Sequence, residues 1–159
     1  MKERAVDRFR AEAEARWLGE LDVREFPEGT KTASDAARAI GCEVGQIVKS
    51  VVLMADGRPI VALTSGANRA DTRKIAAIVG AAEVRKADAA EAREATGFAI
   101  GGTPPMGYPA AVPTFIDDTL MQHDELWAAA GTPYHVFRIT PEELVQASGG
   151  VVASFARQQ

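Results

Sequence analysis

The chain has 159 residues, of which 47 % are apolar and 25 % are charged, the balance expected of one globular domain. Its net charge of −4 excludes a generally basic surface for nucleic acid, and no apolar run reaches the roughly 18 residues of a membrane helix. The single cysteine excludes an internal disulfide. Together with the charged segment 1–10, which does not resemble a secretory signal, it indicates a protein of the reducing cytoplasm.

Charge is distributed unevenly along the chain. Residues 1–30 carry a net charge of −2, residues 31–93 carry +3 and residues 94–159 carry −5. The middle segment is therefore where an anionic partner would bind, and ordinary scatter of surface charge is the alternative interpretation.

The first predicted elements are an N-terminal helix over residues 1–18, a short strand at 21–26 and a helix from about Thr32 to Gly41. A β-hairpin follows, because two apolar runs, 46–55 and 58–64, flank an Asp-Gly pair typical of a type I′ turn. A two-residue turn pairs Ala55 with Arg58 and therefore Lys49 with Thr64. Both faces of these strands are apolar, so the hairpin should be central and covered on both sides.

The rest of the chain predicts a mixture of helices and strands. Helices are expected at 71–80, 88–97 and 140–149, each with a side-chain cap and a terminal glycine, and strands at 83–86, 114–116, 126–130, 134–139 and 151–155. Residues 97–112 form a long loop rich in glycine and proline, a type of loop that is usually functional. We therefore predict an α+β (mixed α/β) fold, in which residues 1–159 form one domain around a central mixed, largely antiparallel sheet flanked by helices.

Lys49 is the first candidate for chemistry, because it stands in the middle of the apolar strand 47–53. Lysine is rarely buried unless it is paired or functional. In a cleft it would hold a phosphate or a carbonyl oxygen, or act as a base if its pKa falls. The alternative is a lysine at a sheet edge whose amine reaches water.

The second candidate is the loop of residues 101–107, Gly-Gly-Thr-Pro-Pro-Met-Gly. Glycines allow a backbone to approach a ligand closely, and prolines stiffen the loop before binding. Such a loop would form an oxyanion hole or a cradle for a ribose or carboxyl group. It has neither the lysine of a P-loop nor the spacing of a dinucleotide fingerprint, and a rigid surface loop without chemical use is the alternative.

Other constellations are weaker. His123 and His135 do not have metal-ligand spacing, so no metal is expected. Cys42 is interpreted as a small buried apolar residue, and no serine or cysteine triad is visible. The four acids of segment 117–125 are interpreted as a solvated acidic face, with a cation site as the alternative.

Four segments, 46–53, 71–74, 95–107 and 113–117, resemble in order the YbaK and prolyl-tRNA synthetase-associated domain family. The resemblance covers residues 20–148. It implies the fold of a synthetase editing domain and the activity of a free-standing, ProX-like protein that hydrolyses mischarged aminoacyl-tRNA. It also implies that the reaction needs no cofactor.

The resemblance also implies residue roles. Lys49 matches the functional lysine of the family, and Gly101 to Pro105 match its Gly-x-x-x-Pro loop, so Lys49, Gly101 and Gly102 are the expected catalytic residues. Phe26 departs from the family, since several relatives carry a tyrosine or histidine there. The expected substrate-binding residues are Thr103, Pro104 and Pro105 of the loop, Thr64 and Ser65, which the hairpin register places beside Lys49 and at the end of the strand, and His135. The basic middle segment supplies the expected tRNA-binding residues, Lys31, Arg69, Arg73 and Lys74.

The favoured function is therefore a trans-editing deacylase for tRNA(Pro) that carries a small non-cognate amino acid. Its partners would be the acceptor end of aminoacyl-tRNA and a synthetase, without DNA or membrane. Two alternatives remain: a non-catalytic module that binds aminoacyl-tRNA or a nucleotide-like ligand beside a synthetase, and a hydrolase of a small ester or amide.

Overall fold

The predicted hairpin forms the centre of the fold in the computed structural model, which describes residues 4–30 and 32–158. Strands β2 (Ile47–Ala55) and β3 (Arg58–Ser65) pair antiparallel in the predicted register, with Lys49 opposite Thr64. The turn residues Asp56 and Gly57 have φ values of 48° and 81°. Two consecutive positive φ values are what a type I′ turn requires, which is why Asp-Gly sets this register.

The hairpin lies within an eight-stranded mixed sheet. Its main path runs β1-β8-β7-β2-β3-β6-β9, and β5 pairs with β2 beside that path. The pairs β2–β7, β3–β6 and β6–β9 are parallel, and the other pairs are antiparallel. The remaining strands of the sheet are β1 (Val23–Glu25), β5 (Val84–Lys86), β6 (Thr114–Asp117), β7 (Leu126–Ala129), β8 (His135–Ile139) and β9 (Val151–Ala153).

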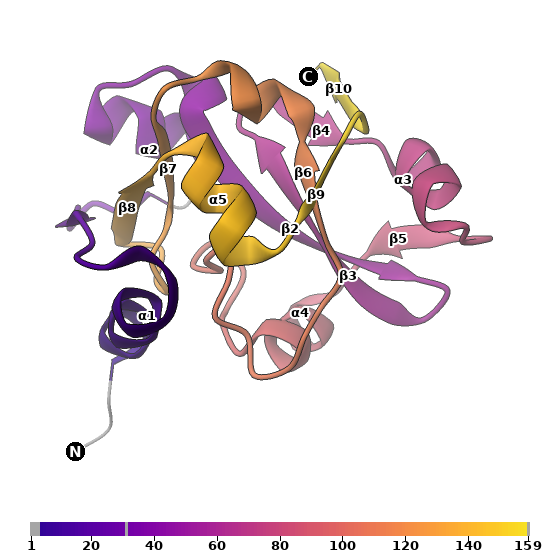
Figure 1. Ribbon diagram of the computed structural model, residues 1–159, viewed down its shortest axis with the longest axis horizontal. Coiled ribbons are helices and arrows are strands. Elements are labelled where there is room, and N and C mark those ends of the chain that lie inside the picture. Colours follow the sequence, from indigo (N-terminus) through magenta and orange to yellow (C-terminus); the bar gives the residue numbers. More distant parts are fainter. Residues whose placement is uncertain (1–3, 31, 159) are drawn as a thin grey trace.

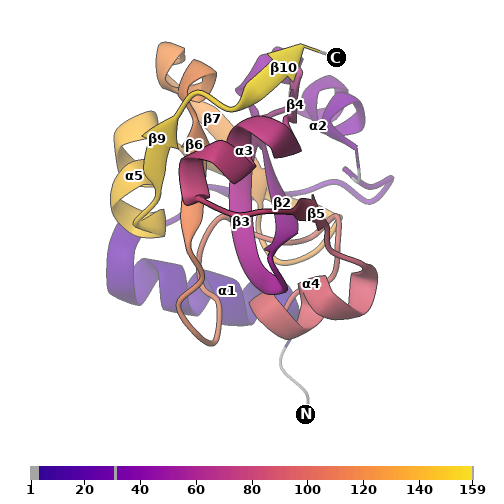
Figure 2. The same cartoon turned by 90° about the vertical axis from the view of Figure 1, so that its right-hand side faces the viewer.

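A second, two-stranded sheet joins distant parts of the chain. Strand β4 (Asn68–Ala70) pairs antiparallel with β10 (Ala156–Gln158), near the C-terminus (Figures 1 and 2). Neither strand was predicted, because residues 65–68 have the composition of a loop and residues 156–158 are short and polar.

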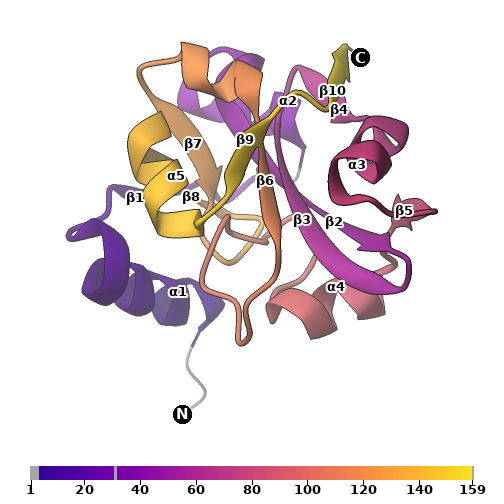
Figure 3. The same cartoon turned by 45° about the vertical axis from the view of Figure 1, so that its right-hand side comes forward.

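Helices cover both faces of the hairpin, as predicted. Helix α3 (Thr72–Val79) packs on one face through Ile75, which belongs to the same apolar cluster as Leu53 and Ala62. Helices α1, α4 and α5 cover the other face (Figure 3). The described helices are α1 (Ala5–Ala13), continued by a π-helical turn over Glu14–Leu18, α2 (Ala33–Ile40), α3 (Thr72–Val79), α4 (Ala89–Thr96), α5 (Pro141–Ser148) and the short 3₁₀ helices η2 (Val44–Gln46) and η3 (Asp118–Gln122).

The helix caps are those that the sequence predicts. The side chains of Thr32, Asp71, Asp88 and Thr140 accept hydrogen bonds from main-chain amides in the first turns of α2, α3, α4 and α5. Each of these helices ends at a glycine in the left-handed conformation. No helix in the described ranges is long and apolar enough to cross a bilayer.

Helix α1 holds two loops in place. Phe9 is buried between Phe98 and Phe137, with ring centroids 6.4 and 5.1 Å away. Arg8 stacks on the Phe98 ring at 4.8 Å and donates a hydrogen bond to the Gly97 carbonyl at 3.1 Å. Gly131 lies so close to α1 that an added Cβ would be 2.8 Å from a helix carbonyl. The loops that begin at residues 97 and 130 are therefore both anchored on α1.

We expect Phe9→Ala to lower the free energy of unfolding by about 3–5 kcal/mol, because it leaves a cavity between two aromatic rings. Urea denaturation followed by circular dichroism measures this loss. Ile78→Ala is the control, since that side chain is 42 % exposed and its removal should cost less than about 1 kcal/mol. Equal effects of the two substitutions would contradict the anchoring role of Phe9.

Candidate active site

The candidate site lies where one edge of β2 loses its partners. On that edge β7 pairs only with Ile47 and Val48, and β5 pairs only from Leu53 to Ala55. Within the described chain, Lys49 to Val52 therefore have no strand partner on this side. The Ala87 amide donates to the Val52 carbonyl at 3.1 Å, and strand alternation directs the main-chain groups of Ser50 toward the same open edge.

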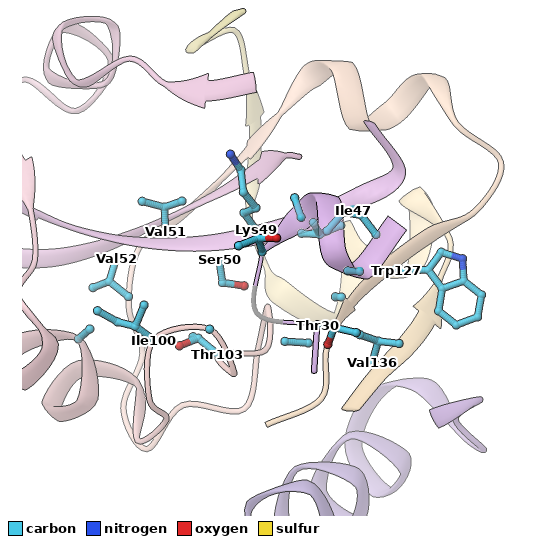
Figure 4. Close-up of a pocket in the computed structure, with 18 of the residues that line it drawn as sticks. Thr30, Ile47, Lys49, Ser50, Val51, Val52, Ile100, Thr103, Trp127 and Val136 are labelled. Atoms are coloured by element: carbon cyan, nitrogen blue, oxygen red, sulfur yellow. The ribbon is translucent and has the colours of Figure 1, made fainter. Parts of the chain in front are cut away.

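A cavity of about 260 Å³ opens at this interruption. Its walls are mostly apolar and include Ile47, Val52 and Val136, and its polar lining groups include Lys49, Ser50 and Thr103. Figure 4 shows that Ser50 and Val52 point to one side of β2, toward Ile100 and Thr103, whereas the Lys49 amine points to the other side. Lys49 and the glycine loop thus reach one cavity from opposite faces of the strand.

The Lys49 amine is held by a main-chain carbonyl. Its Nζ donates a hydrogen bond to the Asn68 carbonyl at 2.6 Å. Half-burial of the side chain lowers the pKa of Lys49, and the nearby positive charges of Lys86 and Arg69 lower it further, against a smaller opposing effect of Asp117. An ammonium group has three donors, so two of them remain for a ligand.

Asp117 is a buried carboxylate that organises the turn around Asn68. It accepts hydrogen bonds from the Ser65 amide, the Asn68 side chain, and the amide and hydroxyl of Thr119, at 2.8 to 3.0 Å. The prediction of a solvated acidic face is wrong for Asp117, which is fully buried, and right for Asp118, which is exposed. Asp117 lies two residues after Phe115 and so shares its face of β6, which packs against an apolar cluster; this spacing is the sequence signal for its burial.

The glycine loop offers fewer free amides than its sequence suggests. The Gly102 amide donates to the Ala99 carbonyl at 3.0 Å, and the Thr103 hydroxyl donates to the same carbonyl at 3.1 Å. Gly101 has a φ of 92° and lines the cavity, whereas Gly102, Pro104 and Pro105 are buried and are absent from its lining. Gly102 packs against the backbone of Thr132, where an added Cβ would lie 2.7 Å from Thr132 Cα.

Three predicted substrate-binding residues, Thr64, Ser65 and His135, do not line the cavity. The Thr64 hydroxyl is fully buried and donates to the Ala62 carbonyl, and the Ser65 hydroxyl donates to the Gly45 carbonyl. His135 alternates with Val136 and therefore faces away from the cavity. Its ring lies 2.6 Å from the Thr132 hydroxyl and 3.3 Å from Glu25.

The sequence analysis missed Ser50. Its hydroxyl is buried in the cavity wall, close to the Tyr108 hydroxyl but without a partner in hydrogen-bond geometry among the described residues. The Tyr108 hydroxyl itself donates to the Pro104 carbonyl at 2.7 Å. Because hydroxyls are common in strands, only the open strand edge identifies Ser50 as a residue available to a ligand.

The predicted tRNA-binding residues separate into three groups. Arg69 and Arg73 line a second cavity on the α3 face of the sheet. Lys74 lies outside that lining and donates to the Ala156 carbonyl at 3.2 Å. Lys31 lies outside the described residues.

The described residues contain no group of three or more His, Cys, Asp or Glu side chains that could hold a metal ion. Burial raises the pKa of the Cys42 thiol, which disfavours the reactive thiolate. The chemistry available at the cavity is that of the ammonium groups of Lys49 and Lys86, main-chain amides, and hydroxyls such as those of Ser50 and Thr103.

The mixed α/β fold of this chain is that of a known protein family. Residues 27–147 match the family described as aminoacyl-tRNA editing domain, and the chain belongs to this family. The predicted resemblance is thereby confirmed. A solved structure of a candidate trans-editing enzyme for prolyl-tRNA synthetase shares 43 % identity with a TM-score of 0.91, covering 99 % of each chain.

Relatives occur both alone and within synthetases. EbsC of Enterococcus faecalis, a candidate Cys-tRNA(Pro)/Cys-tRNA(Cys) deacylase, is 25 % identical over 135 residues, which are 84 % of this chain and 82 % of EbsC. The proline–tRNA ligase of Citrifermentans bemidjiense is 35 % identical over 92 residues, which are 58 % of this chain and 16 % of the ligase.

The positive charge of Lys86 should affect the pKa of Lys49, which a substitution can test. Lys86→Gln removes a like charge, which favours the protonated amine, so the pKa of Lys49 should rise toward its ordinary value of 10.5. A pH titration of the lysine side-chain NMR signals measures this pKa, and Lys74→Gln, a charge-matched control, should leave it unchanged.

The same substitution has a consequence for stability. Between the lowered pKa of folded Lys49 and 10.5, the unfolded chain binds more protons, so stability rises with pH in that window. Lys86→Gln should reduce this rise. A Lys49 pKa that falls or stays constant in Lys86→Gln would contradict the electrostatic coupling.

Proposed function

We propose that this chain is a trans-editing deacylase that hydrolyses the ester of mischarged aminoacyl-tRNA. The single observation that carries the proposal is the interrupted edge of β2, where Lys49 and Gly101 reach one cavity from opposite sides of the strand. A bound ester would lie across this edge. Its aminoacyl group would enter the apolar cavity, and the tRNA would leave past Lys49.

In the reaction, water attacks the ester carbonyl carbon and the carbonyl oxygen becomes an oxyanion. The bond between that carbon and the ribose oxygen then breaks, the ribose oxygen takes a proton, and free amino acid and tRNA are released. Because Pro104 and Pro105 carry no amide proton and the Gly102 amide is bonded to Ala99, the amides of Gly101 and Thr103 are the loop donors we assign to the oxyanion.

The attacking water needs no protein base in this scheme. No histidine lines the cavity in the described part of the chain, and Ser50 has no base beside it. We assign activation of the water to the neighbouring ribose hydroxyl of the substrate. The protein then contributes position and electrostatics, with the Lys49 ammonium stabilising negative charge that develops near the ester.

The cavity favours a small aminoacyl group. Its volume of about 260 Å³ lies below the usual range of pockets for drug-sized ligands, about 300–1,000 Å³. Ser50 would offer a hydroxyl to a polar group of that ligand. The similarity to EbsC, a candidate Cys-tRNA(Pro) deacylase, and to proline–tRNA ligases supports tRNA(Pro) as the carrier and prolyl-tRNA synthetase as the enzyme whose errors are removed.

The first test of this function is a deacylation panel. We expect the chain to hydrolyse one or more small non-cognate esters of tRNA(Pro), among alanine, serine, cysteine and 2-aminobutyrate, and to spare prolyl-tRNA(Pro). Lys49→Ala should lower the rate at least about 100-fold, since a charged donor at the reacting centre is lost. Release of labelled amino acid under single-turnover conditions measures both rates.

Arg58→Ala is the control for loss of a surface charge, because Arg58 is exposed at the hairpin tip and should keep full activity. Full activity of Lys49→Ala would contradict the role of Lys49. Protection of an ester without turnover would instead support the non-catalytic binding module, and hydrolysis of small esters independent of tRNA would support the general hydrolase.

The packing of the glycine loop can be tested separately. In Gly102→Ala the new Cβ would collide with the Thr132 backbone, which is 2.7 Å away, so the loop and the Gly101 amide must shift. A misplacement of about 1 Å costs on the order of 100-fold in rate, and we expect a loss of that size in kcat. Gly45→Ala, whose Cβ would lie 3.4 Å from the His123 ring, is the matched glycine control, and an equal loss in both variants would contradict this role.

A further inference from the structure

A second cavity, of about 800 Å³, lies on the α3 face of the sheet. It shares Lys49, Val51 and Lys86 with the first cavity. The two cavities therefore meet at Lys49, where β2 has its open edge. A ligand that passes Lys49 on its way out of the apolar cavity enters this second one.

The second cavity is strongly cationic. Five basic residues line it: Lys49, Arg69, Arg73, Lys86 and Arg157. None of them forms an ion pair with a carboxylate among the residues that the structure describes, whereas Arg85 and Arg24, outside the cavity, do so with Glu91 and Asp22.

Asp71, the only acidic residue in the lining, does not neutralise these charges. Its Oδ1 accepts hydrogen bonds from the amides of Arg73 and Lys74, which hold the cap of α3. These bonds and the charges of Arg157 and Lys74 lower the pKa of Asp71. One occupied carboxylate therefore faces five cations.

The small sheet brings two of the cations directly together. Arg157 of β10 is the register partner of Arg69 of β4, and side chains directly opposite in an antiparallel pair lie about 4.5–5.5 Å apart at Cβ. Like charges in such positions destabilise a sheet. The pairing is nevertheless held in place, because Phe155 is fully buried and its carbonyl accepts the Asp71 amide at 2.9 Å.

Two like charges fixed opposite each other beside three further cations form a site for a multivalent anion. Guanidinium groups bind phosphate oxygens in a bidentate manner. We propose that the second cavity binds the phosphodiester that precedes the terminal adenosine of tRNA, with Arg69 and Arg157 as its main ligands. This inference rests on the proposed function, and it adds Arg157 and Lys86 to the residues that would bind the tRNA. The terminal nucleotide would then span the β2 edge, with its phosphate on the α3 face and its ester on the other.

Binding of an uncharged RNA tests the site without any hydrolysis. The probe is a fluorescent acceptor-stem hairpin that ends in single-stranded CCA with a free 3′ hydroxyl, and its affinity is measured by anisotropy at several salt concentrations. We expect Arg157→Gln and Arg69→Gln each to weaken binding about 10-fold. Each should also lower the slope of log affinity against log salt by about 0.7, the value for one phosphate contact on a single strand.

A modified probe locates the phosphate. In a second hairpin a neutral methylphosphonate replaces the last phosphodiester. Wild type should bind this hairpin about 10-fold more weakly than the first one, and Arg157→Gln should bind both equally, since the contact is already lost. Arg157→Lys should recover part of the affinity, and Arg58→Gln, which changes an exposed arginine outside the cavity lining, should behave as wild type.

Three outcomes separate this inference from the proposed function. Wild-type affinity and salt slope in both arginine variants would show that the second cavity does not bind the phosphodiester, even if the protein deacylates tRNA. If inorganic phosphate displaced the hairpin at concentrations as low as those at which the hairpin itself binds, the cavity would be assigned to free phosphate instead. A phosphate-dependent loss in Arg157→Gln in a protein that hydrolyses no ester would support the anion site while the proposed function fails.

Discussion

The site depends on how one edge of β2 is shared. A continuous strand partner there would satisfy every main-chain group and close the sheet. Instead β7 leaves β2 after Val48 and β5 joins it only at Leu53. Because β3 supports the full length of β2 on the other edge, the four residues between them stay extended without a second partner. At this interruption two cavities share the lining residues Lys49, Val51 and Lys86.

The two charged groups beside this interruption, Asp117 and Lys49, differ in how many hydrogen bonds stabilise them. The buried carboxylate of Asp117 has four hydrogen bonds, and the rigid turn that they hold presents the Asn68 carbonyl to Lys49. Lys49 donates to this one neutral acceptor, and its nearest charged neighbours include the cations Lys86 and Arg69. An amine in such surroundings is stabilised by an incoming anion, so the same packing that stabilises the acid leaves the lysine ready for a ligand.

Local chemistry made much of the fold predictable from the sequence. Asp56-Gly57 set the hairpin register, and the caps of α2 to α5 set the helix boundaries. Pairing between distant segments was not predictable: the departure of β7 from β2 and the ladder between β4 and β10 have no local signature. Lys49 and the glycine loop have local sequence signals, so they could be predicted as site residues, and their roles stay predictions. Ser50, Asp117 and Arg157 were not predicted, because their surroundings depend on pairing between distant segments. Thr64 was placed in the correct register with the wrong surroundings.

The family match covers residues 27–147, and the segments outside it still contact the site. Helix α1 lies before the match and anchors the loops that carry Gly101 and Thr132. Strand β10 lies after it and brings Arg157 opposite Arg69. The interrupted strand and the glycine loop lie within the matched residues. The segments on either side of the matched residues therefore add two things to the shared domain: a helix against which both loops pack, and a strand that places a second arginine beside Arg69.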